Sequence, residues 1–183
     1  MLALVEALAE ALVPWAGPPF AFFGHSMGAA VGFELARWLR RRGQTQPCAL
    51  LVSGARAPQF RRDHDPPPDP NEEEMIDELR RLEGIPAEVL DHPDLMRVLL
   101  PALRADTALY RRYVYTEEAP LSCPIRAYGG DADPNVRCDH LRAWAEQTAA
   151  SFDLHLFPGG HFYLQTAMPE LLAALSRDCE ALC

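Results

Sequence analysis

The pentapeptide Gly24-His25-Ser26-Met27-Gly28 has the G-x-S-x-G spacing of a nucleophilic serine. This spacing also occurs by chance, and a serine in front of a helix can simply cap that helix. Here the apolar run Phe20 to Phe23 precedes the motif, and a helical pattern follows it. A sharp turn between strand and helix would hold the Ser26 hydroxyl over the end of the sheet. We expect both glycines to be required, because this turn brings backbone and helix close together. The motif therefore predicts that Ser26 is the nucleophile of a serine hydrolase.

A serine hydroxyl is a weak nucleophile and needs a general base. His161 follows an apolar run on the turn Pro158-Gly159-Gly160, from which its imidazole could swing over Ser26. The five other histidines fit this role less well, because they lie inside the motif, in a polar loop, near helix starts or within a strand: His25, His64, His92, His140 and His155. The sequence thus predicts His161 as the base, with an ordinary loop histidine as the alternative.

The acid that orients this base is expected after the third apolar strand, where the chain reads Gly130-Asp131-Ala132-Asp133. Both aspartates qualify by position. The Gly-x-x-Asp pattern selects Asp133, and Pro134 after it would fix the turn. Asp131 is then expected to be a solvated turn residue. The carboxylate of Asp133 would hold the His161 tautomer and stabilise the imidazolium.

Two backbone N–H groups are needed to stabilise the oxyanion of acyl transfer. Met27 can supply one, at the positive N-terminus of the helix that follows Ser26. The second normally comes from a loop after an earlier strand, but only one helix, residues 2–13, is predicted before Phe20. We therefore expect a chain truncated at its N-terminus, in which the strand Phe20 to Phe23 lacks its usual neighbours and exposes unpaired backbone groups.

The elements around these residues alternate between strands and helices, which predicts a parallel sheet flanked by helices. Residues 55–70 are polar and proline-rich and are expected to form a mobile loop, while residues 71–116 predict two or three helices beginning with a capping box of Asn71 and Glu74. The sequence thus indicates one α/β domain over residues 1–183, with a lid-like insertion at roughly 56–119. The predicted strands are 20–23, 48–52, 125–128 and 152–157; the predicted helices outside the insertion are 2–13, 27 to about 42, 139–150 and 169–180.

Composition narrows the class of protein. The formal net charge of −9 argues against a nucleic-acid binder. No apolar run reaches the length of a membrane span, and no signal peptide is recognisable, so we expect a cytoplasmic protein. The five cysteines and the histidines show no metal-ligand spacing, and no cofactor is expected. Cys48 and Cys123 open apolar strands, which favours buried free thiols at both positions.

Five stretches carry a resemblance to a known family: FAFFGHSMGAAVGFELARWLRRRG, LVSGARAP, LPALRADTALYRRYVY, LSCPIRAYGGDADPNV and FDLHLFPGGHFYL. In order and spacing, the sequence resembles the type II thioesterases that accompany polyketide synthases and nonribosomal peptide synthetases. The resemblance implies the α/β-hydrolase fold, without its N-terminal strands. It also implies hydrolysis of aberrant acyl groups from the phosphopantetheine thiol of acyl or peptidyl carrier proteins. Ser26, Asp133 and His161 match the family triad, with Met27 as an oxyanion donor.

Further residues follow from this resemblance with alternatives beside them. Apolar side chains of the insertion could form an acyl pocket or only pack helix against helix: Met75, Ile76, Leu79, Leu95, Met96, Leu99, Leu100 and Leu103. Arginines near the insertion could dock a carrier protein or only solvate a helix face: Arg61, Arg62, Arg104, Arg111 and Arg112. Other functions stay open, namely a general esterase, an inactive remnant or a carrier-binding module. A carrier acyltransferase is disfavoured, because Ala29 stands where such enzymes usually carry Glu.

Overall fold

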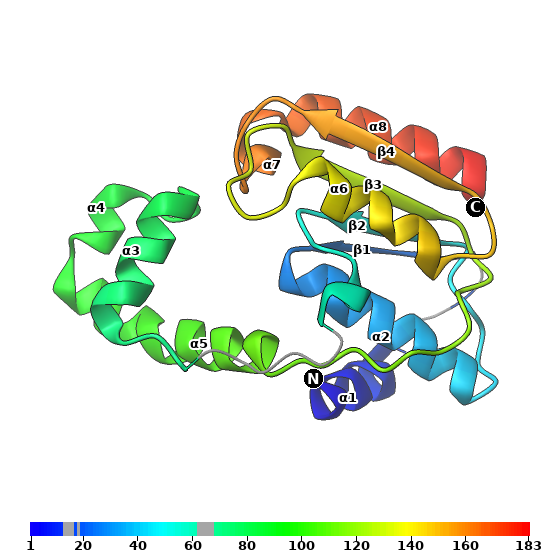
Figure 1. The fold of residues 1–183 in the computed structure, drawn as a ribbon, viewed down its shortest axis with the longest axis horizontal. Coiled ribbons are helices and arrows are strands. Elements are labelled where there is room, and N and C mark those ends of the chain that lie inside the picture. Colours follow the sequence, from blue (N-terminus) through cyan, green and yellow to red (C-terminus); the bar gives the residue numbers. More distant parts are fainter. Residues whose placement is uncertain (13–16, 18, 62–67) are drawn as a thin grey trace.

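The computed structural model describes residues 1–12, 17, 19–61 and 68–183. A sheet of four parallel strands forms the centre of the molecule, in the order β1-β2-β3-β4 (Figure 1). Each strand lies where a short apolar run bounded by turn residues predicts it, within one or two residues. The strands are β1 (Ala21–His25), β2 (Ala49–Ser53), β3 (Ile125–Gly130) and β4 (Phe152–Phe157). The α/β fold class is confirmed.

The central strands β2 and β3 are buried on both faces, as expected for parallel strands. Leu50 and Val52 of β2 pack with helix α2 (Met27–Arg41) and with Trp144 on one face. The alternate residues Ala49 and Leu51 face α8 on the other side. The first face is covered further by α6 (Cys138–Arg142) and the 3-10 helix η3 (Ala143–Gln147), and the second by α7 (Tyr163–Thr166) and α8 (Met168–Leu182).

Strand β1 lies at an edge of this sheet. Within the described residues it pairs with β2 alone, and the ring of Phe23 is 45% exposed. Helix α1 (Leu2–Leu12) packs Val5 and Ala9 against Leu35 and Leu39 of α2, and Phe22 of β1 packs against the same cluster. The edge position expected for this strand is therefore present in the structure.

Three helices lie between β2 and β3 in the chain, and we call them the insertion helices: α3 (Glu72–Leu82), α4 (Ala87–Leu90) and α5 (Pro93–Arg111). Figure 1 shows them beyond the ends of the strands, away from the layers that flank the sheet. The predicted capping box is confirmed, because Asn71 accepts from the Glu74 N–H and the Glu74 carboxylate accepts from the Asn71 N–H.

Two predicted elements need correction, and one helix was not predicted. The helix expected at 139–150 is α6 followed by the tighter η3, so regular helix ends at Arg142. The loop expected at 55–70 contains a 3-10 helix, η2 (Pro58–Arg61), while its residues 62–67 lie outside the described part of the chain. The short helix α7 was not predicted, since four residues are too few to show a helical period.

The expectation of a free thiol is wrong for Cys48 and holds for Cys123. Cys48 forms a disulfide with Cys183, at a Cα–Cα distance of 5.5 Å, whereas Cys123 is free and buried. Pairing across 135 residues depends on the tertiary fold, so no local pattern could predict it. The bond joins the residue before β2 to the end of α8.

None of the helices in the described residues combines the length and apolar composition needed to cross a bilayer.

Candidate active site

Ser26 occupies a strained turn between β1 and α2. Its backbone angles are φ 53° and ψ −118°, in a region that residues with a side chain rarely adopt. The N–H of Ser26 donates to the carbonyl oxygen of Ser53 at 2.8 Å, which fixes the turn against the end of β2. Strain of this kind persists only where the surroundings impose it, and it is common where a side chain must be presented to a ligand.

The two glycines of the motif have different roles. A Cβ on Gly24 would lie 2.2 Å from the carbonyl oxygen of Gly28, so strand and helix meet backbone to backbone at this point. A Cβ on Gly28 would have no atom within 4 Å. The expectation that both glycines are sterically required is therefore wrong for Gly28, which sits in the first turn of α2 with its Cα toward open space.

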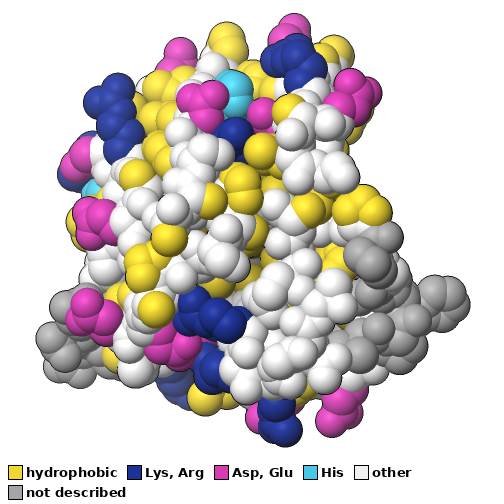
Figure 2. All heavy atoms as spheres, turned by 90° about the vertical axis from the view of Figure 1, so that its right-hand side faces the viewer, with side chains coloured by type: hydrophobic (Ala, Val, Ile, Leu, Met, Phe, Trp, Pro, Cys, Tyr) yellow, Lys and Arg dark blue, Asp and Glu magenta, His cyan; other side chains and the backbone are white. Residues whose placement is uncertain are grey.

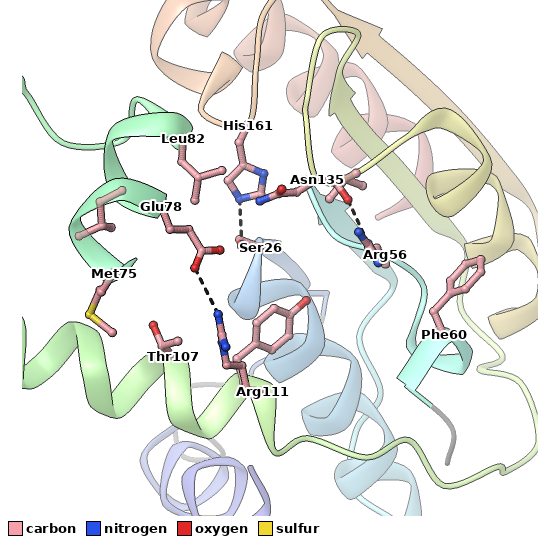
Figure 3. Close-up of a pocket in the computed structure, with 14 residues that line it drawn as sticks. Ser26, Arg56, Phe60, Met75, Glu78, Leu82, Thr107, Arg111, Asn135 and His161 are labelled. Atoms are coloured by element: carbon pink, nitrogen blue, oxygen red, sulfur yellow. Dashed lines mark hydrogen bonds and ion pairs between the residues drawn. The ribbon is translucent and has the colours of Figure 1, made fainter. Parts of the chain in front are cut away.

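The three residues predicted as a triad lie in one hydrogen-bonded line. His161 Nε2 is 3.1 Å from Ser26 Oγ, and His161 Nδ1 is 2.7 Å from Asp133 Oδ2. Figure 3 shows the His161 ring directed at Ser26. The side chains of His161 and Asp133 are 6% and 1% exposed, which shields their hydrogen bond from water. The geometry allows a proton to pass from the serine hydroxyl to the imidazole.

Asp133 is held as a carboxylate. Burial opposes its ionisation, but the hydrogen bond from His161 and the backbone N–H groups of Asn135 and Val136 outweigh burial and hold the pKa of Asp133 below its ordinary value. Asp131 instead accepts from the Gly159 N–H at the surface, 3.1 Å away. The structure thus brings Asp133, and not Asp131, to the imidazole.

Glycines let the histidine loop approach the end of β3. A Cβ on Gly130 would lie 2.2 Å from the carbonyl oxygen of Gly160, and Gly159 has φ 129°. Both conditions exclude larger residues without a shift of backbone. The Pro-Gly-Gly turn therefore positions His161 by close backbone packing against the strand that precedes Asp133.

Met27, the predicted oxyanion donor, is the first residue of α2. The N–H groups in the first turn of a helix have no acceptor within that helix, and they carry its positive dipole end. Next to the Ser26 hydroxyl, such an N–H is suited to stabilise negative charge on an oxygen.

A cavity of about 510 Å³ opens beside Ser26 and His161. Helices α3 and α5 supply one wall, and the segments after β2 and β3 supply the other (Figure 3). Two of the proposed acyl-pocket residues, Met75 and Leu79, line this cavity. The others do not. Met96, Leu100, Ile76 and Leu103 pack within the insertion helices, while Leu95 and Leu99 are exposed. None of these six lies at the cavity beside Ser26, and three of them, Ile76, Met96 and Leu100, line a second hollow between the insertion helices.

The proposed arginine patch is largely neutralised. Arg104 pairs with Glu72, Arg111 with Glu78 and Arg112 with Asp69. The side chains of Arg61 and Arg62 lie outside the described residues. These ion pairs do not support a basic docking surface built from Arg104, Arg111 and Arg112. Figure 2 shows the face opposite the insertion helices, where charged side chains of both signs are interspersed.

Sequence reasoning missed several residues that line the cavity, and it placed Arg111 on a docking surface instead. Arg56 and Asn135 lie on one side, joined by a hydrogen bond from Arg56 Nε to the Asn135 carbonyl oxygen. Glu78 and Arg111 point toward each other from α3 and α5, with 3.4 Å between Oε2 and Nη2 (Figure 3). Periodicity identifies the face of a helix but not what that face meets, so it could not reveal this polar lining.

Comparison with known proteins identifies the family. The model of the thioesterase domain matches residues 1–179. The chain belongs to the thioesterase family. Solved thioesterases superpose on nearly the whole of this chain. This confirms both the resemblance inferred from the motifs and the α/β-hydrolase fold.

Three relatives illustrate the match. The gramicidin S biosynthesis protein GrsT of Aneurinibacillus migulanus is 43% identical over 178 residues, covering 96% of this chain and 68% of GrsT. The thioesterase RedJ from the prodiginine pathway of Streptomyces coelicolor superposes with a TM-score of 0.89 and 35% identity, covering 96% of this chain and 70% of RedJ. The type II thioesterase BorB from the borrelidin cluster gives a TM-score of 0.80 and 39% identity, covering 94% and 72%.

Proposed function

We propose that this thioesterase hydrolyses acyl groups from the phosphopantetheine thiol of acyl or peptidyl carrier proteins, with Ser26 as nucleophile, His161 as base and Asp133 as orienting acid. The main support for this proposal is the pair of hydrogen bonds that joins Asp133 to His161 and His161 to Ser26. Similarity to RedJ and to the type II thioesterase BorB supports the biosynthetic setting. We assign the protein to the cytoplasm on the same grounds.

The geometry supports a two-step reaction. Ser26 Oγ attacks the thioester carbonyl while His161 Nε2 accepts its proton, and the Met27 N–H stabilises the oxyanion. The thiolate of phosphopantetheine leaves, and the proton held on His161 can pass to it. Water, deprotonated by the same imidazole, then attacks the acyl-serine carbonyl. The free acid leaves, and the proton on His161 returns to Ser26 Oγ. Asp133 accepts from Nδ1 throughout and stabilises the imidazolium.

The cavity beside Ser26 would receive the acyl group. Met75 and Leu79 offer apolar contact, while Glu78, Thr107 and Arg111 make the same wall partly polar (Figure 3). We infer that the insertion at roughly residues 56–119, which contains the insertion helices, acts as a lid over Ser26 within a single domain of residues 1–183. A lid that excludes water would strengthen each electrostatic contact at the reacting carbonyl.

Two measurements test the proposal. A fluorophosphonate should label the 183-residue chain at Ser26, and Ser26→Ala should abolish labelling while the circular dichroism spectrum is kept. The unlabelled enzyme should also hydrolyse an acyl-carrier thioester faster than the matching oxygen ester. Labelling without thioester preference would identify a general esterase. A folded chain that resists labelling would be an inactive remnant or a carrier-binding module.

A further inference from the structure

A chain of three polar side chains lies beneath the imidazole of His161. The Tyr163 hydroxyl is 2.7 Å from Ser53 Oγ, and Ser53 Oγ is 2.9 Å from His25 Nδ1. Ser53 is fully buried and Tyr163 is 1% exposed. His25 ends β1, Ser53 ends β2 and Tyr163 begins α7. The chain therefore ties the ends of two strands to the segment that follows His161.

The direction of these hydrogen bonds follows from counting protons. Burial raises the pKa of Tyr163 to about 12, so its phenol keeps its proton. Burial first, and His161 second, lower the pKa of His25 to about 4, so its ring is neutral at pH 7. Ser53 is the only described hydrogen-bond partner of the Tyr163 hydroxyl. Both hydroxyl protons are used only if Tyr163 donates to Ser53 and Ser53 donates to His25 Nδ1.

This order puts the remaining ring proton of His25 on Nε2, which is buried and lacks a hydrogen-bond partner among the described residues. A buried donor without an acceptor costs stability, and such a group needs an explanation. The His25 ring centroid lies 5.0 Å from that of His161 and 5.5 Å from that of Phe162. The His25 ring therefore packs beside the imidazole that faces Ser26.

The space for this arrangement is provided by Gly54. A Cβ there would lie 2.6 Å from Cε1 of His25 and 3.5 Å from Cε1 of His161, and Gly54 has φ 55°. Gly54 itself lines the cavity, whereas His25, Ser53 and Tyr163 do not. The three side chains can therefore influence the reaction only through the residues that they hold.

We propose that His25, Ser53 and Tyr163 are positioning residues that hold the His161 imidazole within hydrogen-bonding distance of Ser26 Oγ. This inference rests on the proposed function, because it presumes that Ser26 is the nucleophile. Tyr163 anchors the polypeptide two residues after His161 by its hydrogen bond to Ser53. Ser53 in turn fixes the His25 ring, and this ring limits the tilt of the His161 imidazole. A displacement of about 1 Å at such a base can cost about 100-fold in rate.

The test removes single hydroxyl oxygens. Tyr163→Phe and Ser53→Ala are compared with Tyr113→Phe, which removes another buried phenol whose hydroxyl donates to Glu34. Two quantities are measured per active site, after titration of the reactive serine: the rate constant of fluorophosphonate labelling, and kcat and KM for an acyl-carrier thioester. Tyr163→Phe and Ser53→Ala should each slow labelling and lower kcat by roughly 10- to 100-fold and leave KM unchanged. Tyr113→Phe should change neither rate.

Three other outcomes would overturn the inference. Equal labelling rates in Tyr163→Phe and the parent chain would overturn it and leave the proposed function intact. Equal losses in Tyr113→Phe would reduce the effect to general loosening of the core and overturn it as well. If the folded parent chain does not react at Ser26 at all, the proposed function fails, and the positioning role fails with it. Should Ser53→Ala not fold, Tyr163→Phe alone decides the question.

Discussion

A Cβ atom on Gly24 would lie 2.2 Å from the carbonyl oxygen of Gly28, so β1 and α2 touch backbone to backbone around the Ser26 turn. We predict that Gly24→Ala destabilises the protein by about 3 kcal/mol or more, because a rigid carbonyl cannot move aside without opening the turn. Chemical denaturation measures this change.

The second glycine of the same motif is the matched control. Gly28→Ala adds a methyl group where no atom lies within 4 Å, in the first turn of a helix. Stability should stay the same or rise by up to about 1 kcal/mol, since alanine favours helix over glycine. Equal destabilisation by the two substitutions would contradict this account of the turn.

Asp133 and Asp131 offer a second matched pair. Asp133→Asn keeps the shape of the side chain but removes the carboxylate that accepts from His161 Nδ1, so kcat should fall by about 10³- to 10⁴-fold. Asp131→Asn alters a surface turn and should leave kcat within about twofold of the parent value. Steady-state thioester hydrolysis distinguishes them, and similar losses in both variants would refute the assignment of the acid.

The role of the cavity in binding the acyl group can be tested by narrowing the cavity. Leu79→Trp enlarges a side chain that lines the cavity beside Ser26, so kcat/KM for long acyl thioesters should fall about 10-fold or more relative to acetyl thioesters. Val98→Trp places the same ring on an insertion-helix residue that is 76% exposed and should leave the ratio unchanged. A parallel shift of chain-length preference in both variants would argue against this cavity as the acyl site.

His25 should make the protein sensitive to acid. The unfolded chain binds a proton at this residue near pH 6.5, and the folded protein only near pH 4. Between these values the unfolded state holds more protons, so stability falls as the pH drops from 6.5 to 4, by up to about 3 kcal/mol.

Thermal unfolding from pH 7.5 to pH 4.5 measures this effect. The melting temperature of His25→Asn should depend less on pH than that of the parent chain. His92→Asn, at an exposed site, should keep the parent slope. Some slope should remain in both variants, because burial, with Arg56 and Arg137 nearby, also lowers the pKa of His140. An unchanged slope in His25→Asn would show that His25 is not the acid-sensitive group.

The Cys48–Cys183 disulfide should stabilise the fold without supporting the chemistry. It closes a loop of 135 residues, which the chain-entropy account values at about 4–5 kcal/mol. Reduction, or Cys48→Ser, should lower the melting temperature but leave kcat at 25 °C unchanged, since Cys48 precedes β2 and the site lies at the opposite end of that strand.

Disulfides are rare in the cytosol, so alkylation in intact cells should trap the thiols of both Cys48 and Cys183 if the proposed location is correct.

Local patterns predicted the sheet and the three side chains of the proposed triad, because each depends on neighbouring residues. Short apolar runs between turn residues identify buried strands, and Ser26, Asp133 and His161 each follow one. Parallel strands then bring these three residues to the same edge. What the sequence could not predict depends on pairing across the fold: the partner of Cys48, the ion pair of Glu78 with Arg111, and the Tyr163–Ser53–His25 chain.

The parallel order of β1 to β4 has a consequence for how the protein acquires activity. Ser26 and His161 are 135 residues apart, and their hydrogen bond requires all three crossovers between the strands to be complete. Contacts this distant in sequence form late, since loop-closure entropy opposes them until the rest of the sheet is assembled. Helices can regain their circular dichroism signal early in refolding, but Ser26 regains its reactivity only after the last strand has joined the sheet. The recovery of this reactivity therefore marks the final step of folding.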